Sequence, residues 1–104
     1  MVPENYKAEL VAFMKTYLNN PANVRDAFIA EPTMKPIGSH SQYVVCVRYN
    51  ARNSDGRYMG SKDAMALFDG GRFDHMIDQF GKGVVNQCVD ADYKHFPELE
   101  ALKR

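Results

Sequence analysis

The chain lacks tryptophan, has only 2 cysteines and has no excess of either charge, with 13 Lys plus Arg against 13 Asp plus Glu. A zero net charge argues against general nucleic-acid binding, which needs a basic excess to neutralise phosphates. No apolar run approaches the roughly 18 residues of a membrane-spanning helix. The cysteines are too few for a disulfide-dense scaffold, and they do not form the CxxC spacing of redox or zinc sites.

The rest of the composition is typical of a folded domain. Apolar residues make up 45% of the 104 residues and charged residues 25%, which are ordinary values for a globular protein. A chain of this length supports one hydrophobic core, whereas two halves would each be too small to fold alone. We therefore expect a single domain over residues 1–104.

An apolar stripe near the N-terminus predicts an amphipathic helix. Pro3 suits the first helical position, and the run Asn19, Asn20 and Pro21 ends the pattern. The apolar side chains recur at three- and four-residue steps. They are Tyr6, Leu10, Phe13, Met14, Tyr17 and Leu18.

The clearest strand runs from residue 42 to residue 50. Its odd-numbered and even-numbered side chains point to opposite faces, and its β-branched and aromatic content supports the prediction. Asp55-Gly56 predicts a hairpin turn, after which a return strand starts at 57–59 and resumes at 64–68. A second turn at 69–72 leads into a short strand at 73–77, with a helix through Phe80 as the alternative.

The remaining segments are less regular. Residues 23–31 fit a strand slightly better than a helical turn. Val84 and Val85 could add a short apolar segment, residues 86–94 are typical of a loop, and residues 97–102 predict a terminal helix. The sum is an α+β domain, in which an N-terminal amphipathic helix packs on an antiparallel β-meander of three to four strands, with a short C-terminal helix.

No pattern of catalytic or metal-binding residues is present in the sequence. Acidic and histidine residues cluster at 74–78 and at 90–95, but neither cluster has the spacing of a calcium loop or a zinc helix. Ser39, His40 and Ser41 are adjacent in sequence, which does not by itself produce a catalytic triad. We expect no metal, no cofactor, no catalytic residue and no enzymatic activity.

A basic, aromatic hairpin is the best candidate for a binding surface. Its residues are Arg48, Tyr49, Arg52, Arg57 and Tyr58. Such a surface could bind an anionic glycan, a phosphate group, lipid headgroups or single-stranded nucleic acid. The alternative is a solvated hairpin whose tyrosines cover the edge of the core. An acidic segment at 63–78 follows, and this charge asymmetry would also suit a homo-oligomer.

The two cysteines allow two interpretations. Cys46 lies in an apolar run and Cys88 in a polar, glycine-containing stretch. In a reducing compartment both would be inert thiols. In an oxidising compartment they could form a disulfide that ties the C-terminal third of the chain to its centre.

Several stretches are unusual enough to carry a resemblance. They are Thr16 to Pro32, Tyr43 to Arg52, Cys88 and Phe96 to Glu100. Together they resemble small uncharacterised cell-envelope lipoproteins of alphaproteobacteria over roughly residues 16 to 100. That family carries no activity to transfer, so the resemblance implies no catalytic residue.

What the resemblance implies is a location. It points to export into an oxidising periplasm, often with a lipid anchor on an N-terminal cysteine, and it favours a Cys46–Cys88 disulfide. No signal peptide or anchoring cysteine precedes Val2, so we expect that Met1 stands in place of a removed leader. Membrane association would then come only through that lost anchor.

These expectations lead to two functional hypotheses. The first is a non-enzymatic binding or interaction domain, periplasmic or anchored at the outer membrane, with an envelope protein or an anionic glycan as partner. The second is a small secreted or periplasmic inhibitor of a hydrolase. In the second, Ser39 to Ser41 or the loop before Cys88 would insert into the target.

Overall fold

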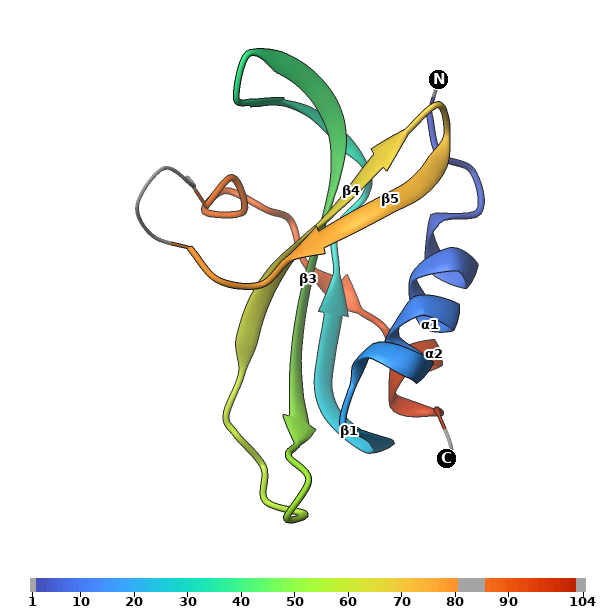
Figure 1. Ribbon diagram of the computed structural model, residues 1–104, viewed down its shortest axis with the longest axis vertical. Helices are drawn as coiled ribbons and strands as arrows, with labels where there is room; N and C mark the ends of the chain where they lie inside the picture. The colour runs from blue at the N-terminus through green and yellow to red at the C-terminus, as the bar shows by residue number, and fades with distance from the viewer. Residues whose placement is uncertain (1, 81–85, 103–104) are drawn as a thin grey trace.

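One long strand, β3, pairs with neighbours along both of its edges and organises the fold (Figure 1). The computed structural model describes residues 2–80 and 86–102. The sheet order is β5-β4-β3-β1-β6, with β2 pairing beside β1 on the same edge of β3, and every pairing is antiparallel. The elements are α1 (Tyr6–Tyr17), β1 (Asn20–Ile29), β2 (Thr33–Ile37), β3 (His40–Arg52), β4 (Lys62–Asp69), β5 (Arg72–Ile77), β6 (Lys94–His95) and α2 (Pro97–Glu100).

The α+β class is confirmed, but the sheet has 6 strands where three to four were predicted. One added strand is β2, where Pro36 is tolerated because β2 pairs only with β3 and needs no second ladder of hydrogen bonds. The other is the two-residue β6, which pairs with β1 at the end of the predicted loop. Helix α1 starts at Tyr6 rather than at Pro3, which is buried instead.

The return strand lacks its predicted start at 57–59. Residues 57–59 contribute only an isolated bridge between Arg52 and Tyr58, and the regular strand β4 begins at Lys62. The strand alternative for residues 73–77 is confirmed. The prediction for Val84 and Val85 lies outside the described residues.

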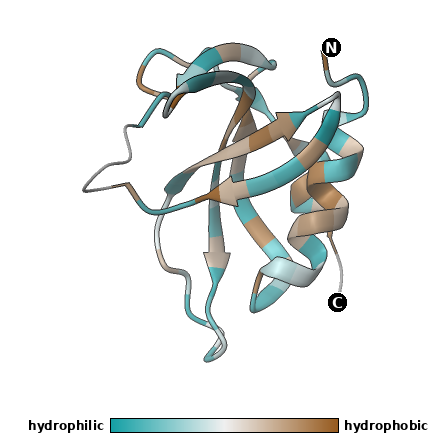
Figure 2. Ribbon diagram, turned by 45° about the horizontal axis from the view of Figure 1, so that its top comes forward, coloured by the Kyte–Doolittle hydropathy of each residue, from teal (hydrophilic) through white to brown (hydrophobic). Residues whose placement is uncertain are grey.

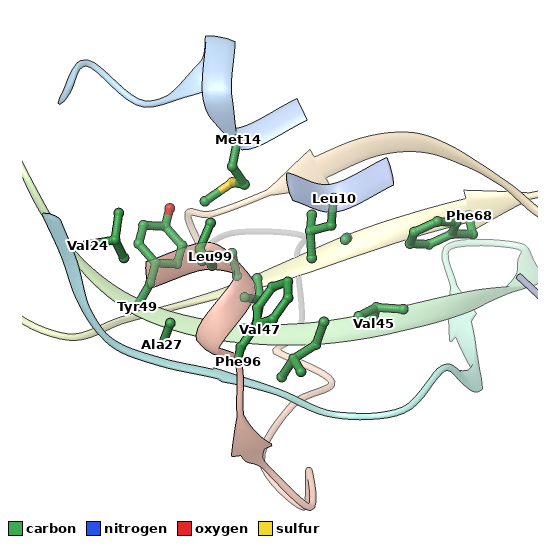
Figure 3. Close-up of a cluster of buried hydrophobic side chains, with 13 residues drawn as sticks. Leu10, Met14, Val24, Ala27, Val45, Val47, Tyr49, Phe68, Phe96 and Leu99 are labelled. Atoms are coloured by element: carbon green, nitrogen blue, oxygen red, sulfur yellow. The ribbon is translucent and has the colours of Figure 1, made fainter. Parts of the chain in front are cut away.

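The predicted alternation along β3 separates two apolar faces. Val45, Val47 and Tyr49 face the helices, whereas Val44 and Cys46 lie on the opposite face. In Figure 3, Leu10 and Met14 of α1 approach the side chains of β3 from above, beside Phe96 and Leu99. The buried members of this main core are Leu10, Met14, Val24, Ala27, Ile29, Val45, Val47, Tyr49, Ala64, Ala66, Phe68, Phe96 and Leu99.

Shortening a side chain of α1 in this core should destabilise the protein. Leu10 is 0% exposed, and we expect Leu10→Ala to lower the free energy of unfolding by about 2–5 kcal/mol, because the lost burial is compounded by a cavity. Chemical denaturation measures the change. Val2→Ala is the control, since Val2 is 54% exposed and should lose little. Equal losses in the two variants would show that Leu10 does not carry the packing described.

The second face of the sheet is covered by the segment from residue 86 to residue 93, which lies on the side away from α1 (Figure 1). A disulfide joins Cys46 of β3 to Cys88 of this segment, with a Cα–Cα distance of 5.7 Å. The cluster comprises Ala30, Val44, Cys46, Met65, Leu67 and Cys88, with Ile37, Ile77, Phe80, Ala91 and Tyr93 packed against it. The disulfide therefore holds a cover over apolar residues that would otherwise meet water.

Removing this disulfide should cost much of the protein's stability. The bridge spans 42 residues, for which loop-closure entropy gives a stabilisation of about 4 kcal/mol. We expect reduction, or the double substitution Cys46→Ala and Cys88→Ala, to lower the free energy of unfolding by about that amount. Reductant should not affect the double variant further. Thiol titration of the denatured, unreduced protein should find no free thiol, and two reactive thiols would refute the bridge.

Two glutamates attach the helices to the sheet. Glu9 of α1 accepts hydrogen bonds from the Phe73 backbone N–H and from Arg72 Nε, both at 3.0 Å. Glu100 of α2 accepts the Ala27 backbone N–H at 3.1 Å and lies 2.7 Å from His95 Nε2. In each case the strand N–H is the largest influence that lowers the pKa of the carboxyl below its ordinary value of 4.5.

The lowered pKa values predict how stability depends on pH. The unfolded chain binds these two protons more tightly than the folded chain, so the stabilisation is complete above about pH 4.5 and is lost as pH falls through the folded-state pKa values. We expect Glu9→Gln with Glu100→Gln to flatten the acid branch of a plot of unfolding free energy against pH. Glu4→Gln with Glu98→Gln, at two exposed glutamates, is the matched control and should leave that branch steep.

Candidate functional site: an arginine-rich end of the sheet

Strand β1 is irregular where it lies beside the end of β3. Its register with β3 shifts between Asn20 and Arg25 and again between Arg25 and Phe28. Asn23 has φ 61° and Asp26 has φ 51°, both in the left-handed region that Asn and Asp tolerate better than most residues. These bulges interrupt the alternation of β1 and leave Arg25 exposed, opposite Asn50 of β3.

The bulged segment is held by a tyrosine from the loop after β3. The Tyr58 hydroxyl donates to the Asn23 carbonyl oxygen at 2.7 Å. The Arg25 guanidinium lies over the Tyr58 ring, with Cζ 4.0 Å from the ring centroid, in a cation–π contact. Tyr58 therefore both supports the left-handed turn at Asn23 and positions the exposed charge of Arg25.

Arg52 occupies the junction of the two strands. Its Nη2 donates to Asn20 Oδ1 and to the Ala22 carbonyl oxygen, each at 3.3 Å, while its Nε is buried with no partner among the described residues. All of the acceptors it contacts are uncharged. The positive charge of Arg52 is thus fixed in place but not cancelled.

Arg57 lies in the turn that follows β3. The Asn53 Oδ1 accepts the backbone N–H groups of Asp55 at 2.9 Å and of Arg57 at 3.1 Å, and the Asn53 N–H donates to the Arg57 carbonyl at 2.8 Å. Gly56 has φ 81°, a value that favours glycine at this point of the turn. A well-defined turn therefore carries the exposed Arg57 side chain.

We call Arg25, Arg52, Arg57 and Tyr58 the arginine surface. Within the described parts of the chain, none of its three guanidinium groups takes part in an ion pair. A shallow depression of about 410 Å³ is lined by Arg25, Arg52, Tyr58 and Glu100 together with Asn23, Val24 and Gly56. Glu100 forms no ion pair with these arginines, and its hydrogen bonds go to Ala27 and His95.

The structure divides the five residues of the predicted hairpin surface. Arg52 and Tyr58 line one depression and Arg57 lies in the adjoining turn. Tyr49 is 3% exposed and belongs to the main core, so it offers no exposed contact surface. Arg48, its neighbour in β3, points to the opposite face, where its Nε lies 2.6 Å from Asp63 Oδ1 and its Cζ lies 4.4 Å from the Tyr93 ring centroid.

The sequence analysis missed Arg25. It is far from the hairpin in sequence, and only the pairing of β1 with β3 brings it to Tyr58. The neighbouring Asn23 and Asp26 were the available signal, because these residue types favour bulges and turns over regular strand. In Figure 2, this end of the molecule carries hydrophilic and neutral colours where the β3–β4 connection protrudes.

The other segments singled out in the sequence lie elsewhere. Ser39 is in the turn between β2 and β3, and His40 and Ser41 are the first residues of β3. Among residues 2–80 and 86–102, no three His, Cys, Asp or Glu side chains gather as metal ligands would. In the same ranges, no helix combines the length and the apolar character that crossing a membrane requires.

No protein-family model, curated protein or solved structure matches this chain. Its function must therefore be inferred from its own residues and their geometry.

Proposed function

We propose that this chain is a non-enzymatic interaction domain of an exported protein, and that its arginine surface binds an anionic glycan of the cell envelope. The observation that carries the proposal is that Arg25 and Arg52 line one depression with Tyr58, with Arg57 in the adjoining turn, and that none of the three arginines has an ion pair among the described residues. Surface arginines commonly pair with nearby carboxylates, as Arg48 and Arg72 do in this protein.

The chemistry of the arginine surface suits a carboxylate or sulfate ligand. A guanidinium group donates two parallel hydrogen bonds to such an anion, and these charge-assisted bonds are stronger than neutral ones. Tyr58 adds a flat apolar ring beside the charges, against which a sugar ring can lie. The Tyr58 ring and the β1 acceptors hold Arg25 and Arg52 in position, so that binding costs little ordering of these two side chains.

The disulfide supports the proposed location. A bridge between Cys46 and Cys88 forms and persists in an oxidising compartment and is rare in a reducing one. The periplasm is such a compartment, and it is the location that the resemblance to envelope lipoproteins implies. We therefore propose a periplasmic or outer-membrane-anchored site of action, where anionic glycans are within reach.

Reversing the exposed charges should weaken the capture of an anionic glycan. The variant Arg25→Glu with Arg57→Glu keeps Arg52, which holds β1 in place, and replaces two attractive contacts by repulsive ones. We expect its affinity for an immobilised carboxylated polysaccharide to fall by about tenfold or more, since each charge-assisted hydrogen bond contributes about 1.5 kcal/mol or more. Column retention and calorimetry at two salt concentrations measure the effect.

The matched control is Lys7→Glu with Lys15→Glu, which makes the same change of net charge on exposed positions of α1. It should retain the polysaccharide, apart from a small general effect that added salt removes. Equal losses in both variants would mean that only net charge matters. Undiminished binding by the Arg25 and Arg57 variant would refute the arginine surface, and preferential capture of an acidic envelope protein over the polysaccharide would refute the glycan as partner.

A further inference from the structure

A second depression lies beside the arginine surface and shares Arg52 with it. It has a volume of about 370 Å³ and lies between the end of α1, the last residues of β3 and the start of β4. We call it the tyrosine cleft. The lining residues that bear on its chemistry are Tyr17, Tyr49, Arg52, Asn53, Lys62 and Asp78.

Asp78 is held in the tyrosine cleft by two partners on the same oxygen atom. The Tyr17 hydroxyl donates to Asp78 Oδ2, and Lys62 Nζ lies 3.5 Å from that atom. The other carboxylate oxygen, Oδ1, has no hydrogen-bond partner within the described residues, and the Asp78 side chain is 23% exposed. The cleft therefore presents a fixed acceptor for a hydroxyl group of a ligand.

Tyr17, which is 39% exposed, gives the cleft a flat wall, whereas Tyr49 lies beneath the cleft in the main core. Burial, followed by the hydrogen bond to Asp78, raises the pKa of Tyr17 above its ordinary value. Burial, and then the charge of Asp78, raises the pKa of Tyr49 to about 12. Met59, which is 69% exposed, adds an apolar side chain to the same wall. Tyrosine rings that are apolar on the face and polar at the tip suit a ligand of mixed character.

Donor groups also line the cleft. Asn53 Oδ1 is engaged by two backbone N–H groups, which leaves the Asn53 amide N–H₂ as the end that can donate to a ligand. The Lys62 side chain is 46% exposed. Arg52 and Lys62 carry two positive charges against the single negative charge of Asp78, so the cleft favours a ligand with one negative charge.

We infer that the tyrosine cleft binds one acidic sugar residue, a hydroxylated six-membered ring that carries a single carboxylate. A ring hydroxyl donates to Asp78 Oδ1, the carboxylate pairs with Lys62 and Arg52, and one face of the ring lies against tyrosine. The volume is at the small end of ligand pockets, about 300–1,000 Å³, which fits one monosaccharide unit better than an oligomer. This inference rests on the proposed function for the identity of the polymer, but the cleft can be tested with the free monosaccharide.

The first test is an NMR titration of the isotope-labelled protein with glucuronate, with glucose at the same concentrations as the neutral comparison. We expect saturable amide shifts at Asn19, Asn53 and Gly60, which line the cleft, with glucuronate binding about tenfold more tightly than glucose because of its carboxylate. Equal binding of the two sugars would overturn the assignment of the charge. No shift with either sugar would overturn the site.

The second test removes cleft groups singly. Tyr17→Phe loses the hydroxyl that orients Asp78, and Lys62→Met loses the cation while keeping a long side chain; each should weaken glucuronate binding by about fivefold to tenfold. Tyr43→Phe is the matched control, since Tyr43 is a half-buried tyrosine outside the cleft. If Tyr17→Phe unfolds, Lys62→Met alone decides, and its unchanged affinity would refute the role of the cation.

The two proposals fail separately on the wild-type protein. If glucuronate binds in the cleft but the protein does not retain a carboxylated polysaccharide, the proposed function is wrong and the cleft stands as a monosaccharide site. If the polysaccharide is retained while glucuronate shifts no cleft residue, the arginine surface binds the polymer and the inference about the cleft is wrong.

Discussion

The structure depends on β3 having two apolar faces, both of which must be kept from water. A strand that pairs along both edges and is apolar on both sides cannot be satisfied by one amphipathic helix. The chain supplies α1 and α2 for the face of Val45 and Val47. For the face of Val44 and Cys46 it supplies a segment without regular structure, which has little cohesion of its own. The Cys46–Cys88 disulfide supplies that cohesion, and such a bridge is compatible with an exported protein.

The same logic explains the arginine surface. Bulges in β1 remove strand hydrogen bonds that an ordinary ladder would provide, so side chains must satisfy the backbone groups left over. Tyr58 donates to the Asn23 carbonyl and Arg52 donates to the Ala22 carbonyl. Because these partners are neutral oxygens, the arginine at the junction keeps its full charge. The need to satisfy backbone carbonyl groups therefore accounts for the positions of Tyr58 and Arg52. The side chains of Arg25 and Arg57 satisfy no such group among the described residues.

Elements that depend on local sequence patterns could be predicted, whereas elements that depend on pairing with distant residues could not. The helix stripe of Leu10 and Met14 and the alternation of β3 are local periodicities, and both predicted elements are present, although their ends differ from the prediction. The strands β2 and β6 could not be predicted from local patterns. The segment around Pro36 is a strand because β3 pairs with it, and the two residues Lys94–His95 are a strand because β1 pairs with them. The candidate surface was partly misjudged for the same reason. Arg48 is paired with Asp63 and Tyr49 is buried in the main core, and neither of these tertiary contacts can be read from the sequence.

Arg52 is where the tyrosine cleft and the arginine surface meet, and this placement bears on how a polymer would bind. In the inferred complex, the carboxylate of a free acidic sugar in the cleft pairs with Arg52. A chain of such sugars can place one unit in the cleft and the next carboxylate near Arg25 and Arg57, with the second contact made at the high effective concentration that a covalent link provides. Repulsion between the two neighbouring carboxylates limits the gain over the monosaccharide. A polymer whose acidic units alternate with neutral ones suits this arrangement better than one that is acidic at every unit.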